Sequence, residues 1–337
     1  MFITFYDKDF RPLADNSSLN VESYSLKRRA YDLNEFSCVC EPIEIEAEPM
    51  FAVLKDNRGA SYYDMLNPII EKNDENKSVV TARDLKALFN TNIVFAPPAV
   101  TPPSAQAAFE EVFAQWKSFL GSGFETVSLD VSDLTGIALK EFSLPAEKDV
   151  RCVKDLFANL LGYYDLYMTS KIDLAQKKLT FVVARTYVQR KLLKLEDFGI
   201  SDFDKVAADV NVAVAMTSDY SQRKNWYLTS KNQITDNAAL QDIFPVKAEI
   251  YTNDDLTQAN YDAIAALADN RFQEGIEVNT AEIAGDFFDG ADFGTTYEIY
   301  TKKGKYKDLP IGEISETDPD NRVIRIGYKP ISFIQMI

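Results

Sequence analysis

Three aspartates recur every third residue near the end of the chain, Asp286, Asp289 and Asp292, within the glycine-containing segment 285–294. Closely spaced carboxylates are typical Ca²⁺ ligands, but a loop of the EF-hand type needs oxygens at positions 1, 3 and 5 and a bidentate glutamate at position 12. The spacing here does not match that pattern. Because Gly and Asp together favour turns, we interpret the segment as a solvated turn.

Two pairs of glutamates, Glu44 with Glu46 and Glu110 with Glu111, provide the two carboxyl groups that glycoside hydrolysis requires. Such pairs arise by chance in a chain with 52 acidic residues. The separation that decides the chemistry is not readable from the sequence. A carboxylate-dependent cell-wall glycoside hydrolase therefore stays one alternative function.

The chain contains no histidine, which removes the usual general base and the commonest ligand of catalytic zinc. The patterns GxGxxG, GxxxxGK[ST], GxSxG, HExxH and paired CxxC are also absent from the sequence. We therefore expect a protein that is not an enzyme and that has no catalytic, cofactor-binding or metal-binding residues.

Aromatic and basic clusters allow two further interpretations. The cluster Tyr163, Tyr164 and Tyr167 is typical of core or interface, with a sugar-binding platform as the alternative. That alternative would make the chain a carbohydrate-binding module. Three short basic runs, 27–29, 190–194 and 302–307, are too dispersed for a nucleic-acid footprint. We interpret these runs as solvated faces of the protein, as charges that protect edge strands from pairing, or as partners in salt bridges between subunits.

The three cysteines, Cys38, Cys40 and Cys152, are too few for a disulfide framework. Cys38 and Cys40 point the same way in a strand-like run, and Cys152 lies far from them in the sequence. We expect all three to be reduced thiols in a protein that folds in a reducing cytosol.

The net charge is 36 − 52 = −16. Phosphate backbones and anionic lipids repel such a chain, so we expect neither stable nucleic-acid binding nor stable membrane binding. The first residues lack the basic flank and the long apolar region of a signal peptide. Apolar runs such as 212–216 are far shorter than the ~20 residues of a membrane helix.

The pattern of residues predicts an α+β, β-rich chain with two β-barrel domains of tube type and mixed α/β structure between or outside them. Short alternating runs predict an N-terminal barrel over residues 1–96, with a helix over 82–90 that closes one end of it. Four prolines mark a linker over residues 97–103.

A mixed α+β domain is expected over residues 104–190. Ser104 should cap a helix with the apolar stripe Phe109, Val112, Phe113, Trp116, Phe119 and Leu120 that stops at Gly121. A second helix is predicted over 148–161, and strands over 165–172 and 179–187. Residues 191–337 are predicted to form a second barrel, whose continuity the sequence leaves open, with an α/β insertion near 245–275 that includes a helix over 257–272.

Three stretches resemble the hub or tail-associated proteins at the tail tip of long-tailed phages and prophages, which share the baseplate-hub fold of the T4 tail. These stretches are LNEFSCVC (33–40), VVTARDLKALF (79–89), and FDGADFGTTYEIY (288–300) with the meander to RVIRIG (322–327). They are patterns of residue type and order that span both ends of the chain.

The resemblance implies a structural virion protein at the tail tip. In that family, three subunits with two barrels each form a ring that adapts the tail tube to a three-fold tip. The partners it implies are further copies of the chain, distal tail proteins, and tail tube or tape-measure proteins, with DNA only as passing cargo. Many such proteins continue into a fibre or a hydrolase, and any activity of that extension does not carry over to this chain.

Overall fold

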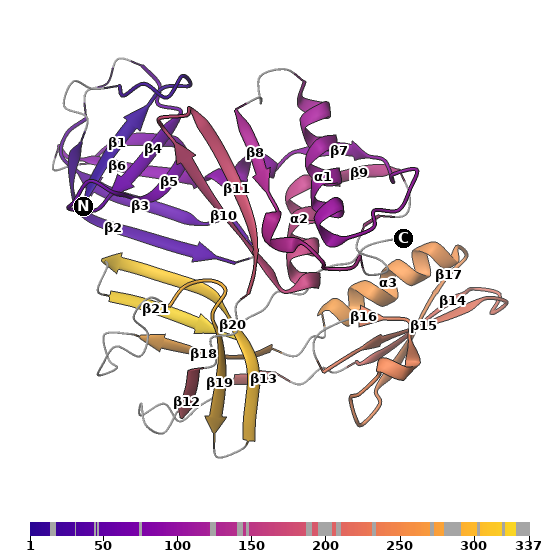
Figure 1. Cartoon of the computed structure of the whole chain (residues 1–337). Coiled ribbons are helices and arrows are strands. Elements are labelled where there is room, and N and C mark those ends of the chain that lie inside the picture. The colour runs from indigo at the N-terminus through magenta and orange to yellow at the C-terminus, as the bar shows by residue number, and fades with distance from the viewer. Residues whose placement is uncertain are drawn as a thin grey trace.

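The computed structural model describes residues 1–13, 18–30, 32–43, 45, 47–73, 76–121, 126–139, 144–145, 148–186, 191–194, 204–206, 210–230, 234–269, 273–279, 291–301, 304–318 and 321–327 (Figure 1). The chain is rich in β-structure and contains mixed α/β parts, which confirms the predicted fold class. Among these residues, no helix is both long enough and apolar enough to cross a lipid bilayer.

The N-terminal part is a closed six-stranded barrel. Its strands pair in the order β1-β4-β5-β6-β3-β2, and β2 pairs again with β1. The strands are β1 (Phe2–Tyr6), β2 (Leu19–Arg29), β3 (Glu35–Cys40), β4 (Phe51–Lys55), β5 (Ser61–Lys72) and β6 (Ser78–Asp84). Alternating apolar residues point inward, and Ile3, Leu26, Leu54, Met65 and Val80 are fully or almost fully buried in the barrel core.

Strand β4 is buried on both faces. Ala52 and Leu54 belong to the barrel core, whereas Phe51 and Val53 pack against a second apolar cluster outside the barrel. That second cluster contains the helices of the middle part of the chain. The barrel and the middle part therefore share a continuous apolar contact.

The middle part packs two helices and small sheets against the barrel. Strand β10 pairs with β11, which pairs in parallel with β8, and β7 pairs with β9. The elements are β7 (Asn92–Phe95), α1 (Ala105–Leu120), β8 (Val127–Asp130), β9 (Asp149–Cys152), α2 (Val153–Tyr164), β10 (Leu166–Asp173) and β11 (Lys178–Arg185). Ser104 caps α1 as predicted, since its Oγ accepts a hydrogen bond from the amide of Ala107 at 3.2 Å. Phe119 is 56% exposed and lies outside the buried stripe.

Two predicted helices differ from the structure. The helix predicted over 148–161 begins only at Val153, because Asp149–Cys152 pairs with β7 as a strand, and it continues through Gly162 to Tyr164. The helix predicted over 82–90 is a 3₁₀ segment, Leu85–Phe89, because β6 continues to Asp84. Leu85 and Phe89 belong to the cluster that surrounds α1 and α2, so this segment joins the barrel to the middle part and does not fill the barrel core.

The C-terminal part contributes a second six-stranded sheet in the order β12-β19-β20-β21-β18-β13. Its strands are β12 (Lys191–Lys194), β13 (Asp204–Val206), β18 (Gln273–Asn279), β19 (Thr296–Thr301), β20 (Gly304–Asp318) and β21 (Asn321–Ile326). Strand β20 also pairs with β2, so the sheet continues into the first barrel. Within the described ranges, no pairing between β12 and β13 closes this second sheet.

The two six-stranded sheets have the same strand order. When the strands of each sheet are numbered one to six along the chain, both follow the order 1-4-5-6-3-2. One direction differs, because β1 and β4 are antiparallel whereas β12 and β19 are parallel. The two β-rich ends of the chain are thus related in topology.

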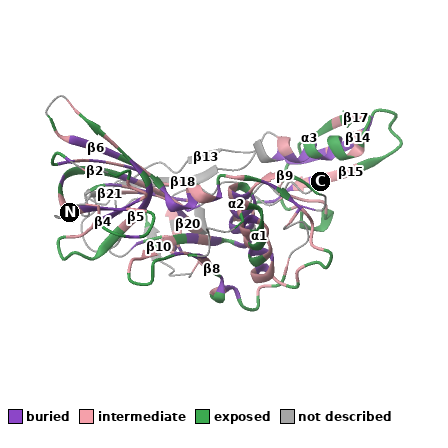
Figure 2. Ribbon diagram, turned by 90° about the horizontal axis from the view of Figure 1, so that it is seen from above, coloured by how far each residue is buried: buried purple, intermediate pink, exposed green. Residues whose placement is uncertain are grey.

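A separate α/β unit lies between β13 and β18 in the chain. Its sheet has the order β16-β15-β14-β17, and α3 packs on one face. The elements are β14 (Val212–Thr217), β15 (Arg223–Leu228), β16 (Ile234–Thr235), β17 (Ala248–Asn253) and α3 (Leu256–Asp269). The unit stands at the far end of the molecule from the N-terminal barrel (Figures 1 and 2). The insertion expected near 245–275 overlaps the second half of this unit, and the predicted domain boundaries stay predictions.

Candidate functional site

A charged seam joins the two six-stranded sheets where β2 meets β20. Four residue pairs are in register, from Leu26 opposite Glu316 to Arg29 opposite Glu313. Successive side chains of Lys27–Arg29 point to opposite faces of β2. Glu313 and Glu316 likewise point to opposite faces of β20. Each face of the seam therefore carries basic side chains opposite one glutamate.

On the inner face, Glu316 accepts contacts from three side chains. Its carboxylate is fully buried, lies 2.9 Å from Nη2 of Arg28 and 3.3 Å from Nε of Arg322, and accepts a hydrogen bond from the hydroxyl of Tyr62. Arg28 also contacts Asp292 at 3.2 Å. Burial lowers the pKa of Arg28, but Asp292 and Glu316 raise it more, so the net shift is upward. Burial and the bond to Glu316 raise the pKa of Tyr62 to about 12.

On the outer face, Glu313 is the common acceptor of three cations. Its oxygens lie 3.2 Å from Nε of Arg29, 3.3 Å from Nζ of Lys27 and 3.2 Å from Nη1 of Arg325. Lys27 and Arg29 lie on β2, Glu313 on β20 and Arg325 on β21. The ion pairs therefore connect β2 to β20 across the seam and β20 to β21 within the second sheet. The charges on this face restrict the two sheets to one relative position.

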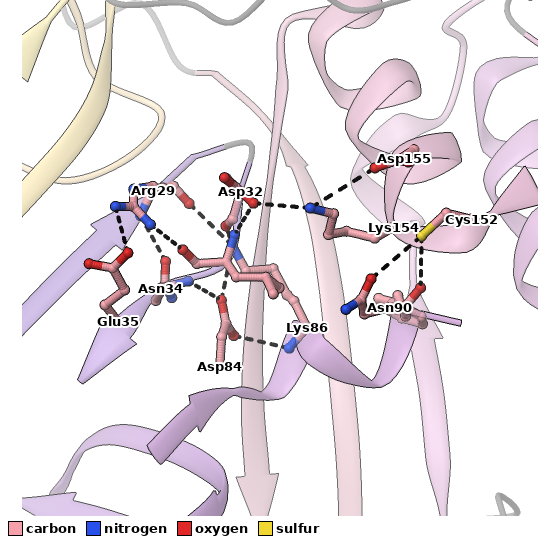
Figure 3. A network of polar contacts seen from close by, with 12 residues as sticks. Arg29, Asp32, Asn34, Glu35, Asp84, Lys86, Asn90, Cys152, Lys154 and Asp155 are labelled. Carbon is pink, nitrogen blue, oxygen red and sulfur yellow. Dashed lines mark hydrogen bonds and ion pairs between the residues drawn. The ribbon is translucent and has the colours of Figure 1, made fainter. Parts of the chain in front are cut away.

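The same network continues from the seam to helix α2 (Figure 3). Arg29 donates to the carbonyl of Leu33 at 3.0 Å, and Asp84 accepts from the amide of Asn34 at 2.9 Å. The ammonium group of Lys86 donates to the carbonyl of Asp32 at 2.6 Å and lies 3.2 Å from the Asp84 carboxylate.

Asp32 completes the connection between the barrel and the middle part. Its carboxylate contacts Nζ of Lys154 on α2 at 3.3 Å. Burial raises the pKa of Asp32, but hydrogen bonding to Leu33 and the charge of Lys154 lower it more, so the net shift is downward. The turn between β2 and β3 thus holds together the barrel, the second sheet and the middle part.

The described end of the Gly–Asp segment also lies against the seam. Asp292 pairs with Arg28, and the Arg28 guanidinium lies 5.7 Å from the ring centroid of Phe293. Gly294 has φ +93°, and a Cβ there would come within 2.8 Å of the Tyr167 ring. Only glycine fits at this close approach, which links the second sheet to β10. Asp286 and Asp289 lie outside the described residues.

Where the structure describes them, the other sequence candidates do not assemble into a reactive site. Glu110 is exposed on α1, and Glu111 accepts a hydrogen bond from Gln115; adjacent helical residues point about 100° apart and do not oppose each other. Glu44 and Glu46 lie outside the described residues. Within the described part of the chain, no three His, Cys, Asp or Glu side chains form a group suited to a metal ion.

The tyrosine and cysteine candidates have structural surroundings. Tyr164 is buried in the cluster around α1 and α2, as the core interpretation predicts, and Tyr167 lies beside Gly294 of the same chain. The side chain of Tyr163 lies outside the described residues. The three cysteines are free thiols, as predicted. Hydrogen bonding with Cys40 and burial raise the pKa of Cys38.

Sequence reasoning missed the seam because the partners are distant in the chain. The run Lys27–Arg29 was assigned to solvated faces, edge strands or contacts between subunits, but it forms ion pairs within one chain. The available signal was the spacing of Glu313 and Glu316 in a strand-like segment. The runs 190–194 and 302–307 have side chains outside the described residues, apart from Lys194.

The seam and its extension to α2 have the properties of a structural junction. Its carboxylates Glu313 and Glu316 pair with arginines of the neighbouring strand. The arrangement can fix the relative position of three parts of the molecule. The seam is therefore suited to a structural role within the chain.

No family model and no curated protein matches the sequence. Among solved structures, the chain is similar to prophage tail protein gp18 from Listeria monocytogenes EGD-e, with a TM-score of 0.50 and 9% identity over 98% of this chain and 95% of that one. It is also similar to the tail protein from Neisseria meningitidis MC58, with a TM-score of 0.45 and 12% identity over 98% and 96% of the two chains.

A third similar structure is the E. coli c3393 protein, a component of the type VI secretion system with structural similarity to the T4 tail proteins gp27 and gp5. Its TM-score is 0.43 and its identity 7%, over 95% of this chain and 76% of that one. The chain has the fold of a phage tail protein, in agreement with its sequence resemblance to tail-tip hub proteins.

Proposed function

We propose that the chain is a structural hub protein of the tail tip or baseplate of a phage or prophage, and that three copies form a ring. The observation that carries this proposal is the repeated strand order 1-4-5-6-3-2 at the two ends of a chain with a tail-protein fold. Two related sheets in each of three chains give six similar segments. Such a ring matches a six-fold tail tube on one side and a three-fold tip on the other.

The charged seam supports this proposal. A ring of six similar segments requires that the two sheets of each chain keep a fixed rotation relative to each other. The β2–β20 pairing and the ion pairs of Glu313 and Glu316 supply that constraint within one chain. We propose the domain division 1–96, 97–103, 104–190 and 191–337 for this arrangement.

The net charge supports a passage for DNA through the ring. Three copies carry 3 × (−16) = −48. Lysine-rich walls would bind phosphates by counterion release and hold the genome, whereas acidic walls let it pass. DNA is therefore proposed only as cargo, with no stable nucleic-acid or membrane binding.

Further copies of the chain, distal tail proteins, and tail tube or tape-measure proteins are the proposed partners, and the virion tail tip is the proposed location after synthesis in the bacterial cytoplasm. We propose a role without catalysis or cofactor. The packing of Tyr164 and Tyr167 leaves the saccharide-binding alternative without a supporting observation, and the glutamates of α1 do not form the opposed pair of a glycoside hydrolase.

Light scattering and electron microscopy of the purified chain test the proposal. We expect a species of 3 × 38.0 = 114 kDa at high micromolar concentration, with a closed ring that looks six-fold in projection. A species of 38.0 kDa at every concentration, or a closed two-fold dimer, would contradict the trimeric ring.

A further inference from the structure

Strand β17 forms one edge of the sheet in the α/β unit. It pairs in parallel with β14, and within the described ranges no strand pairs with its other side. The carbonyls of Lys247 and Asn253 face β14, because each accepts a hydrogen bond from an amide at the start of β14 or just after its end. Backbone groups alternate along a strand, so those of Ala248, Ile250 and Thr252 face the free edge. β17 therefore offers a row of donors and acceptors to a further strand.

The same part of the chain exposes several large apolar side chains. Phe244, just before β17, is 90% exposed, and Ile250 within it is 61% exposed. Four exposed large hydrophobic residues lie between positions 240 and 250: Leu240, Phe244, Val246 and Ile250. Ile250 lies opposite Val214 on the face of the sheet that α3 leaves uncovered, since the neighbouring Tyr251 packs against the α3 cluster. Exposed apolar residues gathered in this way mark an interaction site.

The loop before β17 has a fixed backbone. Nδ2 of the buried Asn211 donates to the carbonyl of Pro245 at 2.8 Å, and its Oδ1 accepts from the amide of Lys247 at 2.9 Å. Asp242 accepts hydrogen bonds from both the amide and the hydroxyl of Ser230. A partner that binds here therefore has little of this loop to order, which lowers the entropic cost of binding.

The free edge lacks the usual features that prevent strand addition. Edge strands are commonly protected by charged side chains, by proline or by a bulge. The uncovered face of β17 carries Ala248, Ile250 and Thr252, none of which is charged, and the strand contains no proline. Its register with β14 is unbroken over all six residues, so no bulge interrupts it. The strand therefore has the properties of one that accepts an added strand from a partner.

The charges around β17 select the kind of partner. Glu249 points to the opposite face of the strand from Ile250, and the exposed Asp242, Asp254 and Asp255 flank the strand. Residues 242–255 carry a net charge of 1 − 4 = −3. A second copy of the chain, with its net charge of −16, would bring like charges to this edge. A basic segment of another protein is attracted to it instead.

We propose that the free edge of β17 binds an extended segment of a different protein in which apolar and basic residues alternate. The segment adds one strand to the sheet. Its apolar side chains lie beside Ile250, its basic side chains lie beside Glu249 on the opposite face, and Phe244 contacts it at the start of β17. The α/β unit stands at the far end of the molecule from the N-terminal barrel (Figures 1 and 2). The inference therefore concerns this unit alone and holds whether or not three copies form a ring.

Fluorescence anisotropy with the full chain and a labelled synthetic peptide of alternating valine and lysine tests the proposal. We expect saturable binding of one peptide per chain, and no binding of the matched peptide of alternating valine and glutamate. Ile250→Lys should weaken binding roughly tenfold, because it places a charge among the apolar side chains. Ile69→Lys is the matched control: Ile69 is 53% exposed on β5, and the variant has the same net charge. It should bind the peptide like the wild-type chain, and both variants should keep the wild-type melting temperature.

A charge reversal tests the orientation of the added strand. Glu249→Lys should weaken binding of the valine–lysine peptide several-fold and strengthen binding of the valine–glutamate peptide. Equal losses in Ile250→Lys and Ile69→Lys would overturn the proposal, because binding would then follow net charge alone. Absence of peptide binding, or loss of self-association in Ile250→Lys, would also overturn it. A chain that binds the peptide but stays at 38.0 kDa would contradict the ring and support the edge site.

Discussion

Glu316 combines full burial with a full negative charge at the seam. Arg28, Arg322 and Tyr62 come from three different strands, β2, β21 and β5, and all contact its carboxylate. Buried ions are tolerated when paired and become costly when a partner is removed. The residue therefore contributes to the junction of the two sheets together with the backbone pairing of β2 and β20.

Glu316→Gln should lower the free energy of unfolding by about 3–5 kcal/mol, because it leaves Arg28 and Arg322 buried without their carboxylate. Glu22→Gln is the control on β2, since Glu22 pairs with Lys77 at 2.7 Å while its side chain is 40% exposed. It should cost less than about 1 kcal/mol. Denaturant unfolding measures both variants, and equal losses would contradict the role assigned to the seam.

Asp64 and Asp219 should make the stability of the folded state depend on pH in opposite directions. Burial raises the pKa of Asp64 above 3.8, although its oxygens accept bonds from the Ile172 amide and the Ser61 hydroxyl. The folded state then binds the proton more tightly, so stability relative to Asp64→Asn should fall as pH rises above 3.8 through the raised pKa.

The exposed Asp219 has the reverse linkage. Hydrogen bonding from the Thr217 hydroxyl lowers its pKa to about 2. Its stabilisation is present above 3.8 and should be lost as pH falls toward 2, relative to Asp219→Asn. Melting temperatures from about pH 2.5 to about pH 7 compare the three proteins. The same slope for both variants would refute the assignments.

At the scale of elements, the 3₁₀ segment Leu85–Phe89 packs against three elements of the middle part. The Phe89 ring lies 4.8 Å from Trp116, 4.6 Å from Phe157 and 4.4 Å from Phe181, between ring centroids. These partners belong to α1, α2 and β11. Phe89, together with Leu85, therefore joins the barrel to the middle part.

Phe89→Ala should destabilise the chain by about 3–5 kcal/mol, since it opens a cavity among rings that cannot all collapse onto it. Phe119→Ala on α1 removes an equal volume from a side chain that is 56% exposed, and its cost should be below about 1 kcal/mol. Thermal unfolding distinguishes the two. Comparable losses would mean that Phe89 is not an anchor between the parts.

Local signals account for the elements that the sequence predicted well. Helix α1 has a capping serine, an apolar stripe of helical spacing and a terminal glycine, all within its own residues. Asp149–Cys152 has no such signal, and its strand exists because β7 lies beside it. A short segment without a clear period is helix or strand according to its neighbours.

At the scale of the whole molecule, charge and assembly oppose each other. A trimer brings together 3 × (−16) = −48 charges. Repulsion between like-charged copies extends over about 10 Å at 0.1 M salt and over about 3 Å at 1 M. The proposed ring must therefore form against a repulsion that depends on ionic strength.

Raising sodium chloride from about 0.05 M to about 0.5 M should strengthen assembly of the ring several-fold, because salt screens the repulsion between copies that each carry a net charge of −16. Sedimentation velocity at matched protein concentrations measures the trimer fraction. Assembly that weakens steadily with salt would show instead that complementary charges dominate the interface.

The sequence by itself determined the β-rich composition, the helix α1, the reduced state of the thiols and the resemblance to tail-tip proteins, because each depends on residues close together in the chain or on composition. The tertiary structure alone decided the seam, in which Arg28 meets Glu316 across 288 positions, and the shared strand order of the two sheets. Strand pairing is non-local, so a basic run shows its charge in the sequence but not its partner. The sequence offers 52 acidic residues as partners for Arg28, and only the fold determines that Glu316 is the one it meets across the seam.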